Sequence, residues 1–203
     1  VFSWDSRDKV FTVDTNTNTL GMELNAGLVY DAPRVVNQGW PHLLVENATV
    51  RQPLKELSAM RLSWEQRLTM FRDHMGAAAD PLLHAGSFYI HLYIKGVNDR
   101  GLEEMLWFGL TLFDNRFDFE EEKGSEDTGK ADATGLFIYQ VPTRAYRRVP
   151  VGSHWLSAEV DVLPYVRRAL ELAGQRGYMR GVSWESMYLD GMNMGWEMPG
   201  TYD

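Results

Sequence analysis

Alternating residues in the segment 87–95, SFYIHLYIK, could bind a sugar. In an extended strand they share one face, and Trp107 has the same parity in the neighbouring run 104–113. Aromatic rings stack on the C–H faces of sugars, while histidine and lysine bond hydroxyl groups. We therefore predict a carbohydrate-binding platform formed by Tyr89, His91, Tyr93, Lys95 and Trp107. The alternative is a second small core, with these aromatic residues covered by loops or a helix.

The segment 191–200, GMNMGWEMPG, alternates in the same way. One face carries methionine and tryptophan and suits a core, whereas the other carries Gly191, Asn193, Gly195 and Glu197. Glycine inside a strand often marks the close approach of a ligand or of another backbone. We predict that Asn193 and Glu197 bond hydroxyl groups in a groove. A bulge or a tight sheet corner is the alternative explanation for the glycines.

A hydrolase would need a pair of carboxyl groups. Hydrolysis of a glycoside requires two of them about 5 to 9 Å apart, one kept protonated by its surroundings. Glu159 and Asp161 share the non-core parity of the segment 154–164, so Glu197 with either of them is the predicted catalytic pair. The alternative is that Glu159 and Asp161 are solvated carboxylates on an outer face.

A polysaccharide lyase would instead need a base beside a group that neutralises charge. His91 is the candidate base, and Lys95 or Arg116 could act as the neutralising cation.

Metal chemistry has little support in the sequence. The five histidines show no pair at the spacing of a helical zinc site, and the absence of cysteine excludes disulfides, thiolate zinc sites and thiol nucleophiles. The acidic segment 114–135 is rich in oxygen ligands but lacks a recognisable calcium-binding spacing. We therefore predict no cofactor and no metal ligand, leave calcium open as an alternative, and expect a long solvated loop here.

Strands must position most of these residues. Short alternating runs punctuated by Gly, Pro, Asn and Asp predict a mostly β protein, an antiparallel β-sandwich of the jelly-roll or concanavalin A-like type with one or two short helices. The convincing helix is 164–174, which proline opens and an apolar stripe follows. The predicted strands are 9–14, 27–30, 42–46, 60–70, 87–95, 104–113, 136–142, 154–164 and 191–198. For 60–70 the alternative is a helix, with an apolar stripe of Leu57, Met60, Trp64, Leu68 and Phe71.

Composition limits the partners. A chain of 203 residues with 44% apolar content fits one domain, residues 1–203, which could belong to a longer polypeptide. Its net charge of -8 argues against nucleic acid and anionic membranes as partners. No apolar run approaches the roughly 20 residues of a membrane span, so we predict no membrane insertion. The start at Val1 indicates a processed chain, and we expect a secreted or extracytoplasmic protein without its signal peptide.

Three segments resemble parts of secreted bacterial β-sandwich proteins associated with polysaccharide use. They are LWFGLTLFDNR at 106–116, VDVLPYVRRALELA at 160–173 and GMNMGWEMPGTYD at 191–203. The resemblance implies carbohydrate binding or processing on a jelly-roll or concanavalin A-like sandwich.

Three functional hypotheses follow. The first is recognition of a polysaccharide or oligosaccharide on the aromatic face. The second is an enzyme, either a glycoside hydrolase or a polysaccharide lyase. The third is a structural or assembly sandwich, which would form oligomers and bind no glycan. The oligomeric state itself has no signature in the sequence.

Overall fold

The computed structural model describes residues 1–128, 130–131, 133–146, 150–152 and 154–203, apart from the side chains of residues 48–50. Short 3₁₀ turns lie between several of its elements. The strands and the α-helix are β1 (Phe2–Asp5), β2 (Lys9–Asp14), β3 (Thr19–Leu24), β4 (His42–Pro53), β5 (Arg61–Gln66), β6 (Ser87–Val97), β7 (Glu103–Asp114), β8 (Lys123–Glu126), β9 (Phe137–Gln140), β10 (Leu156–Asp161), α1 (Leu163–Gln175) and β11 (Tyr188–Glu197).

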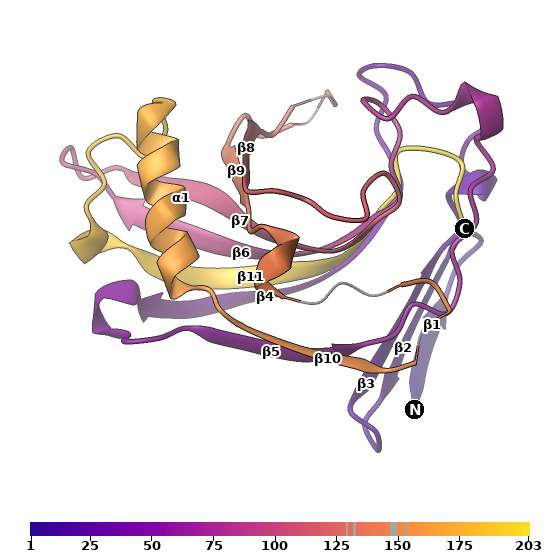
Figure 1. Cartoon of the computed structure of the whole chain (residues 1–203), viewed down its shortest axis with the longest axis horizontal. Coiled ribbons are helices and arrows are strands. Elements are labelled where there is room, and N and C mark those ends of the chain that lie inside the picture. Colours follow the sequence, from indigo (N-terminus) through magenta and orange to yellow (C-terminus); the bar gives the residue numbers. More distant parts are fainter. Residues whose placement is uncertain (129, 132, 147–149, 153) are drawn as a thin grey trace.

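A six-stranded sheet forms one layer of the fold, in the order β4-β11-β6-β7-β9-β8. The late strand β11 lies between β4 and β6 and pairs antiparallel with both. Neighbouring pairs in this sheet are antiparallel except β7 and β9, which run parallel. The strands are bent, and β5 and β10 lie below their convex side (Figure 1).

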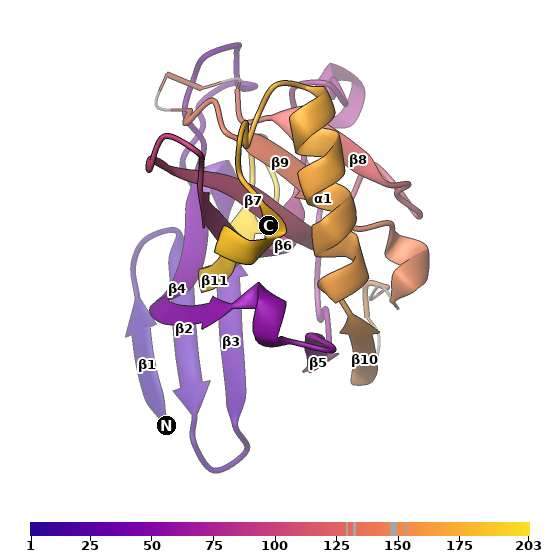
Figure 2. The same cartoon turned by 90° about the vertical axis from the view of Figure 1, so that its left-hand side faces the viewer.

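The second layer has three parts, all packed on one face of the six-stranded sheet. Helix α1 and the β5–β10 pair lie together on that side (Figure 2), where their apolar side chains join those of β6 and β7 in the main core. The β1–β2–β3 sheet packs against the end of β11 in a smaller core around Trp196. The chain is thus a mostly β sandwich with one α-helix among its described residues, which confirms the predicted fold class.

Local patterns explain the elements that were predicted from sequence. Val166, Ala169 and Ala173 follow helical spacing in α1 and are fully buried. Pro164 starts this helix, since its missing N–H would have no partner in the first turn. In β11, Met192 and Met194 face the core beside Leu92 and Ile90 of β6, as the alternation predicted.

Two predictions about local structure are wrong. The segment 27–30 is not a strand, because Ala26–Leu28 form a 3₁₀ turn closed by the Val29 N–H bonding to the Ala26 carbonyl. The acidic segment 114–135 is not entirely loop, because it contains β8. This short polar strand pairs with β9 at the edge of the sheet, where no apolar alternation is needed.

Candidate functional site

The face of the six-stranded sheet opposite the core carries a row of polar side chains that crosses the strands. Asn193 of β11 lies opposite Glu46 of β4 on one side and His91 of β6 on the other. His91 lies opposite Gly109 of β7, which lies opposite Gln140 of β9. We call this surface the polar face. No strand or helix within the described ranges packs on it, and loops border it.

The predicted aromatic residues line up on the polar face. The ring centroids of Tyr89 and His91 lie 5.2 Å apart, and the Trp107 ring meets those of His91 at 6.0 Å and Tyr93 at 5.0 Å, both edge to face. Tyr93 is only 7% exposed, and its hydroxyl donates a 2.7 Å hydrogen bond to Glu46. The Tyr93 ring is therefore fixed in position and packs edge to face with the Trp107 ring. Trp107, Tyr89 and His91 are half-buried and form the accessible part of the platform.

A glycine allows the middle of the row to form. A Cβ atom on Gly109 would lie 2.2 Å from the Gln140 side-chain oxygen, so the Gln140 amide occupies the space that any other residue would fill. From there Gln140 Nε2 lies 3.4 Å from His91 Nε2. Because an amide nitrogen can only donate, His91 Nε2 accepts this bond and a neutral His91 carries its proton on Nδ1.

Gly195 has a structural explanation instead. Its φ of +152° is rarely adopted by L residues, and a Cβ there would lie 1.9 Å from the carbonyl oxygen of Leu43. The irregularity between Leu189 and Gly191 is a bulge in the pairing of β11 with both neighbours. Close backbone approach and a bulge therefore account for these glycines, which is the alternative considered from the sequence.

Glu197 lines a cavity of about 340 Å³ at one end of the polar face. Trp40, Ser87, Tyr89 and Arg116 are among its other lining residues. Trp40 Nε1 donates a 3.1 Å hydrogen bond to Glu197 Oε2, which fixes the carboxylate beside an aromatic ring. A half-buried carboxylate that faces a cavity can accept a hydroxyl proton or donate one when protonated.

Loops position Trp40 at this end. The guanidinium of Arg34 lies 4.8 Å from the centre of the Trp40 ring, and Lys130 Nζ lies 5.0 Å from it. A single β-bridge joins Asn37 to Lys130, so the loops on either side of Trp40 are tied together. Both cations therefore attach the indole to the rim of the cavity.

A buried ion pair between Arg116 and Asp114 holds the Tyr89 hydroxyl in place. Arg116 contacts both carboxylate oxygens of Asp114, with a shortest distance of 2.6 Å, and Ser87 and Tyr89 donate hydrogen bonds to the same carboxylate. Burial opposes ionisation of Asp114, but the Arg116 bonds outweigh it and lower the Asp114 pKa. Burial and the charge of Asp114 raise the Tyr89 pKa, so Tyr89 keeps its proton. Arg116 therefore fixes the Asp114 carboxylate to which Ser87 and Tyr89 donate, and it is not a solvated cation.

Glu159 and Asp161 lie in the other layer of the sandwich. Glu159 is exposed on β10, on the side away from the buried Val160. Asp161 Oδ1 accepts the backbone N–H groups of Met60 and Leu163, so it ties the start of α1 to the segment before β5. The structure does not bring either carboxylate together with Glu197, because β10 lies on the opposite side of the core from the polar face.

Lys95 forms ion pairs with two carboxylates. Its ammonium lies 2.7 Å from Asp190 and 3.2 Å from Glu103, and the hydrogen bond to Asp190 is the main reason that its pKa is raised. Glu103 also accepts a hydrogen bond from Tyr188. Lys95 therefore lies at the far end of the β6 row in a cluster that neutralises its charge.

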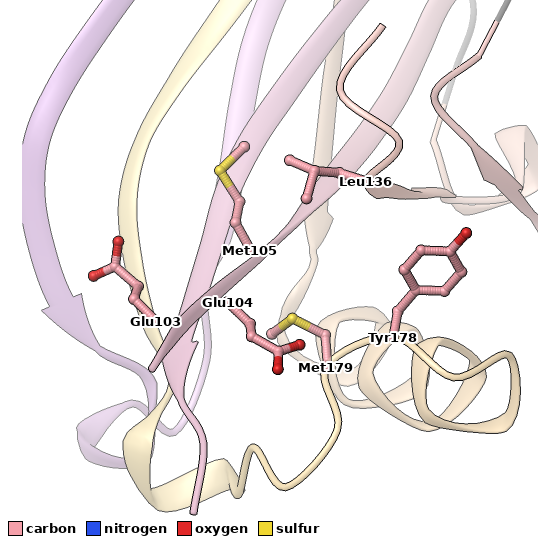
Figure 3. A pocket seen from close by; sticks show the side chains of 6 residues that line it. All are labelled: Glu103, Glu104, Met105, Leu136, Tyr178 and Met179. Carbon is pink, nitrogen blue, oxygen red and sulfur yellow. The ribbon is translucent and has the colours of Figure 1, made fainter. Parts of the chain in front are cut away.

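A second cavity, of about 260 Å³, lies beside this cluster. Figure 3 shows Met105 and Leu136 along one side of it, with the Glu104 carboxylate next to Met179 and the Tyr178 ring beyond. None of the predicted site residues lines it. The aromatic platform is thus separate from this cavity.

His91 is held in its neutral form. Burial lowers its pKa below the ordinary 6.5, although the charges of Glu197 and Asp127 and a side-chain hydrogen bond with Asn193 act in the opposite direction. A neutral imidazole can donate one hydrogen bond and accept another. Since Nε2 already accepts from Gln140, the hydrogen-bonding capacity that neutral His91 retains is its Nδ1–H.

Replacing His91 with glutamine should reduce the loss of stability on acidification. As the pH falls through about 6.5, the unfolded chain binds a proton at this residue that the folded protein takes up only at lower pH, so the free energy of unfolding decreases. We expect Tm to fall less between about pH 7 and pH 5 in His91→Gln than in the parent. Parallel curves for parent and His91→Gln would contradict the expectation.

Two features are absent from the ranges that the structure describes. There, no three His, Asp or Glu side chains gather closely enough to hold a metal ion. Among the same residues, no helix has the length and apolar character that a membrane span requires.

Several residues of the polar face were not predicted from the sequence. Glu46, Gln140 and Trp40 reach it from β4, β9 and a loop, and Glu120 reaches it from the acidic segment. Glu120 is buried and accepts a 2.7 Å hydrogen bond from Thr111. The alternation of residues 104–113 predicted the face on which Thr111 lies. Its partner Glu120 could not be predicted, because the contact depends on the path of the loop that carries Glu120.

Comparison with known proteins yields no family. No protein-family model and no curated protein matches the sequence. Among solved structures, a cellulase derived from the Cel12A cellulase of Rhodothermus marinus is 15% identical over 98% of this chain and 84% of its own, with a TM-score of 0.47. A family 11 xylanase from Neocallimastix patriciarum is 10% identical over 96% and 80%, with a TM-score of 0.40. Similarity at this level carries no weight for activity, and the fold class rests on this chain's own strands.

Proposed function

We propose that the polar face binds a neutral polysaccharide or oligosaccharide. The observation that carries the proposal is a sheet face on which no strand or helix of the described ranges packs, and on which aromatic rings lie beside hydrogen-bonding side chains. Trp107 and Tyr89 supply rings for sugar C–H faces, while His91, Asn193 and Glu197 supply hydroxyl partners. Lys95, which is paired with Asp190 and Glu103 at the end of the row, is proposed as a further partner for a sugar hydroxyl.

The charges favour a neutral sugar. Glu46, Glu197 and Asp127 surround His91 and Asn193, whereas Arg116 and Lys95 are paired with carboxylates. An acidic sugar placed against His91 and Asn193 would meet like charge. A neutral glycan avoids that cost.

A glycan array with parallel reducing-end and unsaturated-product assays tests the proposal. Binding of neutral oligosaccharides without product supports recognition, new reducing ends support a hydrolase, and unsaturated products support a lyase with His91 as base. Preference for uronic acid polymers would contradict the neutral-sugar assignment. Oligomers in solution scattering together with no glycan binding would favour an assembly protein.

A glycoside hydrolase is the second candidate, since the polar face carries two carboxylates and one of them, Glu197, lines the cavity. Glu197 is on β11 and Glu120 bonds to Thr111 on β7. Glycosidases use carboxyl groups roughly 5 to 9.5 Å apart, so this candidate requires the Glu120 and Glu197 carboxyl groups to lie at that separation. Glu120 thus replaces Glu159 and Asp161 as the proposed partner of Glu197.

The variant Glu197→Gln tests this candidate. If Glu197 donates the proton to the leaving group, turnover should fall by about 10² to 10⁴-fold while glycan binding persists, because the amide keeps the shape and loses the acid. Turnover is measured as reducing ends and binding by calorimetry. Unchanged turnover would remove Glu197 from the mechanism. A comparable loss in Glu159→Gln would instead support the pair predicted from the sequence.

A further inference from the structure

The cavity that Glu197 lines combines polar groups from the sheet with apolar groups from two loops. Its strand residues are Ser87, Tyr89 and Glu197, and Tyr89 also belongs to the aromatic platform. The loops before β4 and before β6 contribute aliphatic side chains, and a proline follows β11. These apolar lining residues are Val36, Leu82, Leu83, Ala85 and Pro199. The same cavity therefore joins the proposed sugar-binding groups to an apolar surface.

Two of the aliphatic side chains at this cavity are largely exposed. Leu82 is 95% exposed and Val36 is 68% exposed. A single exposed aliphatic residue on a protein surface needs no explanation, whereas apolar side chains that gather around a cavity are typical of ligand sites. Leu82 and Val36 come from different loops and line the same cavity. A ligand in the cavity would therefore cover apolar surface that is in contact with water.

The two loops are joined to each other by buried polar side chains. Arg34 Nη1 donates a 3.1 Å hydrogen bond to the carbonyl oxygen of Leu83, and His84 Nε2 lies 2.9 Å from the carbonyl oxygen of Arg34. Arg34 and His84 are each only 4% exposed. Because these bonds connect the loops, the neighbouring Val36 and Leu82 are held at the cavity before a ligand binds. Binding then requires little further ordering of the loops.

We propose that this cavity binds an uncharged aryl group carried by a terminal sugar of the glycan. The proposal rests on the carbohydrate-binding function proposed above and adds a second part of the ligand. The sugar lies against Tyr89 and Glu197, and the aryl group lies against Val36 and Leu82. The Trp40 ring also lines the cavity and favours an aryl group over an alkyl group. With about 340 Å³, the cavity is at the lower end of the range of small-ligand sites, about 300 to 1,000 Å³, which suits one substituent.

The first test compares oligosaccharides that carry an aryl group with matched methyl forms. Cellohexaose, xylohexaose and mannohexaose are prepared as phenyl 1-thioglycosides, which resist hydrolysis, and as 4-O-benzyl ethers at the other end, each beside its methyl counterpart. In calorimetry, the parent should bind the aryl form of at least one pair about tenfold or more tightly than the methyl form, because the ring leaves water for an apolar surface. Equal affinity within every pair would overturn the proposal. Tighter binding of a p-carboxyphenyl form than of the phenyl form would also overturn it, since the cavity would then select charge.

The second test uses the double variant Val36→Thr/Leu82→Asn. Both replacements nearly keep the shape of the side chain and remove its apolar character, and both positions are exposed, so Tm should stay within about 2 °C of the parent value. The preference for the aryl form should fall below about threefold, while the affinity for the methyl form stays at the parent value. The matched control is Val35→Thr/Leu102→Asn, the same replacements at positions 63% and 59% exposed outside the cavity lining, which should keep the full preference. An undiminished preference in Val36→Thr/Leu82→Asn would overturn the proposal.

The two tests separate this inference from the function on which it rests. If no glycan binds the parent in any assay, with or without an aryl group, the carbohydrate-binding function fails, and the aryl site fails with it. If the methyl forms bind and the aryl group adds nothing, the function stands and the aryl site is excluded.

Discussion

Replacing Trp107 with alanine is expected to lower glycan affinity by at least about tenfold, or about 1.4 kcal/mol, while the protein remains folded. The Trp107 ring is half-buried and contacts the rings of Tyr93 and His91 edge to face. Affinity is measured by calorimetry with the glycan that binds the parent, and folding by thermal circular dichroism. The truncation should cost only a few degrees of Tm, because no helix or strand in the described ranges covers the ring.

Trp155 provides the matched control. It is 49% exposed, stacks with the Arg67 guanidinium, and immediately precedes β10 in the other layer. Trp155→Ala removes the same side chain and should leave glycan affinity unchanged. Loss of cooperative unfolding in Trp107→Ala would place Trp107 in a second core, the alternative considered from the sequence.

Replacing Gly195 with alanine is expected to destabilise the protein by more than about 4 kcal/mol, enough to unfold a typical domain or to abolish its soluble expression. The new Cβ would meet the Leu43 carbonyl oxygen at 1.9 Å, and that atom is held in the β4–β11 ladder. The φ of +152° adds backbone strain for any L residue. Chemical denaturation of the variant and the parent measures the difference.

Gly174 is the control for this substitution. It lies exposed in α1, and a Cβ atom added there would have no atom from outside its own helix within 4 Å, so Gly174→Ala should stabilise the protein by up to about 1 kcal/mol. A folded Gly195→Ala with parent stability would mean that β4 can move away from β11. The glycines of β11 would then have to be explained by a ligand after all.

The side-chain parity of the main strands could be predicted from the sequence. Alternation of Leu106, Phe108 and Leu110 with Trp107 and Gly109 is a property of a half-buried strand, whatever lies beside it. For the same reason Tyr89, His91 and Tyr93 were correctly placed on the face away from the core.

Strand order could not be predicted in this way. The row Glu46, Asn193, His91 and Gln140 combines residues from β4, β11, β6 and β9, and only the pairing of the strands brings them together. Glu159 has the correct parity within its own strand, but β10 pairs with β5 in the other layer. Parity specifies the face of a strand, whereas the layer that contains the strand is set by long-range contacts.

The central position of β11 has a consequence for how the chain folds. Strands β4 and β6 each leave one edge without its neighbour until residues 188–197 insert between them. This step joins segments nearly 150 residues apart in the case of β4, so a large loop entropy must be overcome before the ladder forms. Until then, both edges and the apolar faces beside them are open to pairing with other chains. Assembly of the sheet, rather than formation of α1, is therefore expected to limit the folding rate, and the two open edges are the sites most exposed to aggregation.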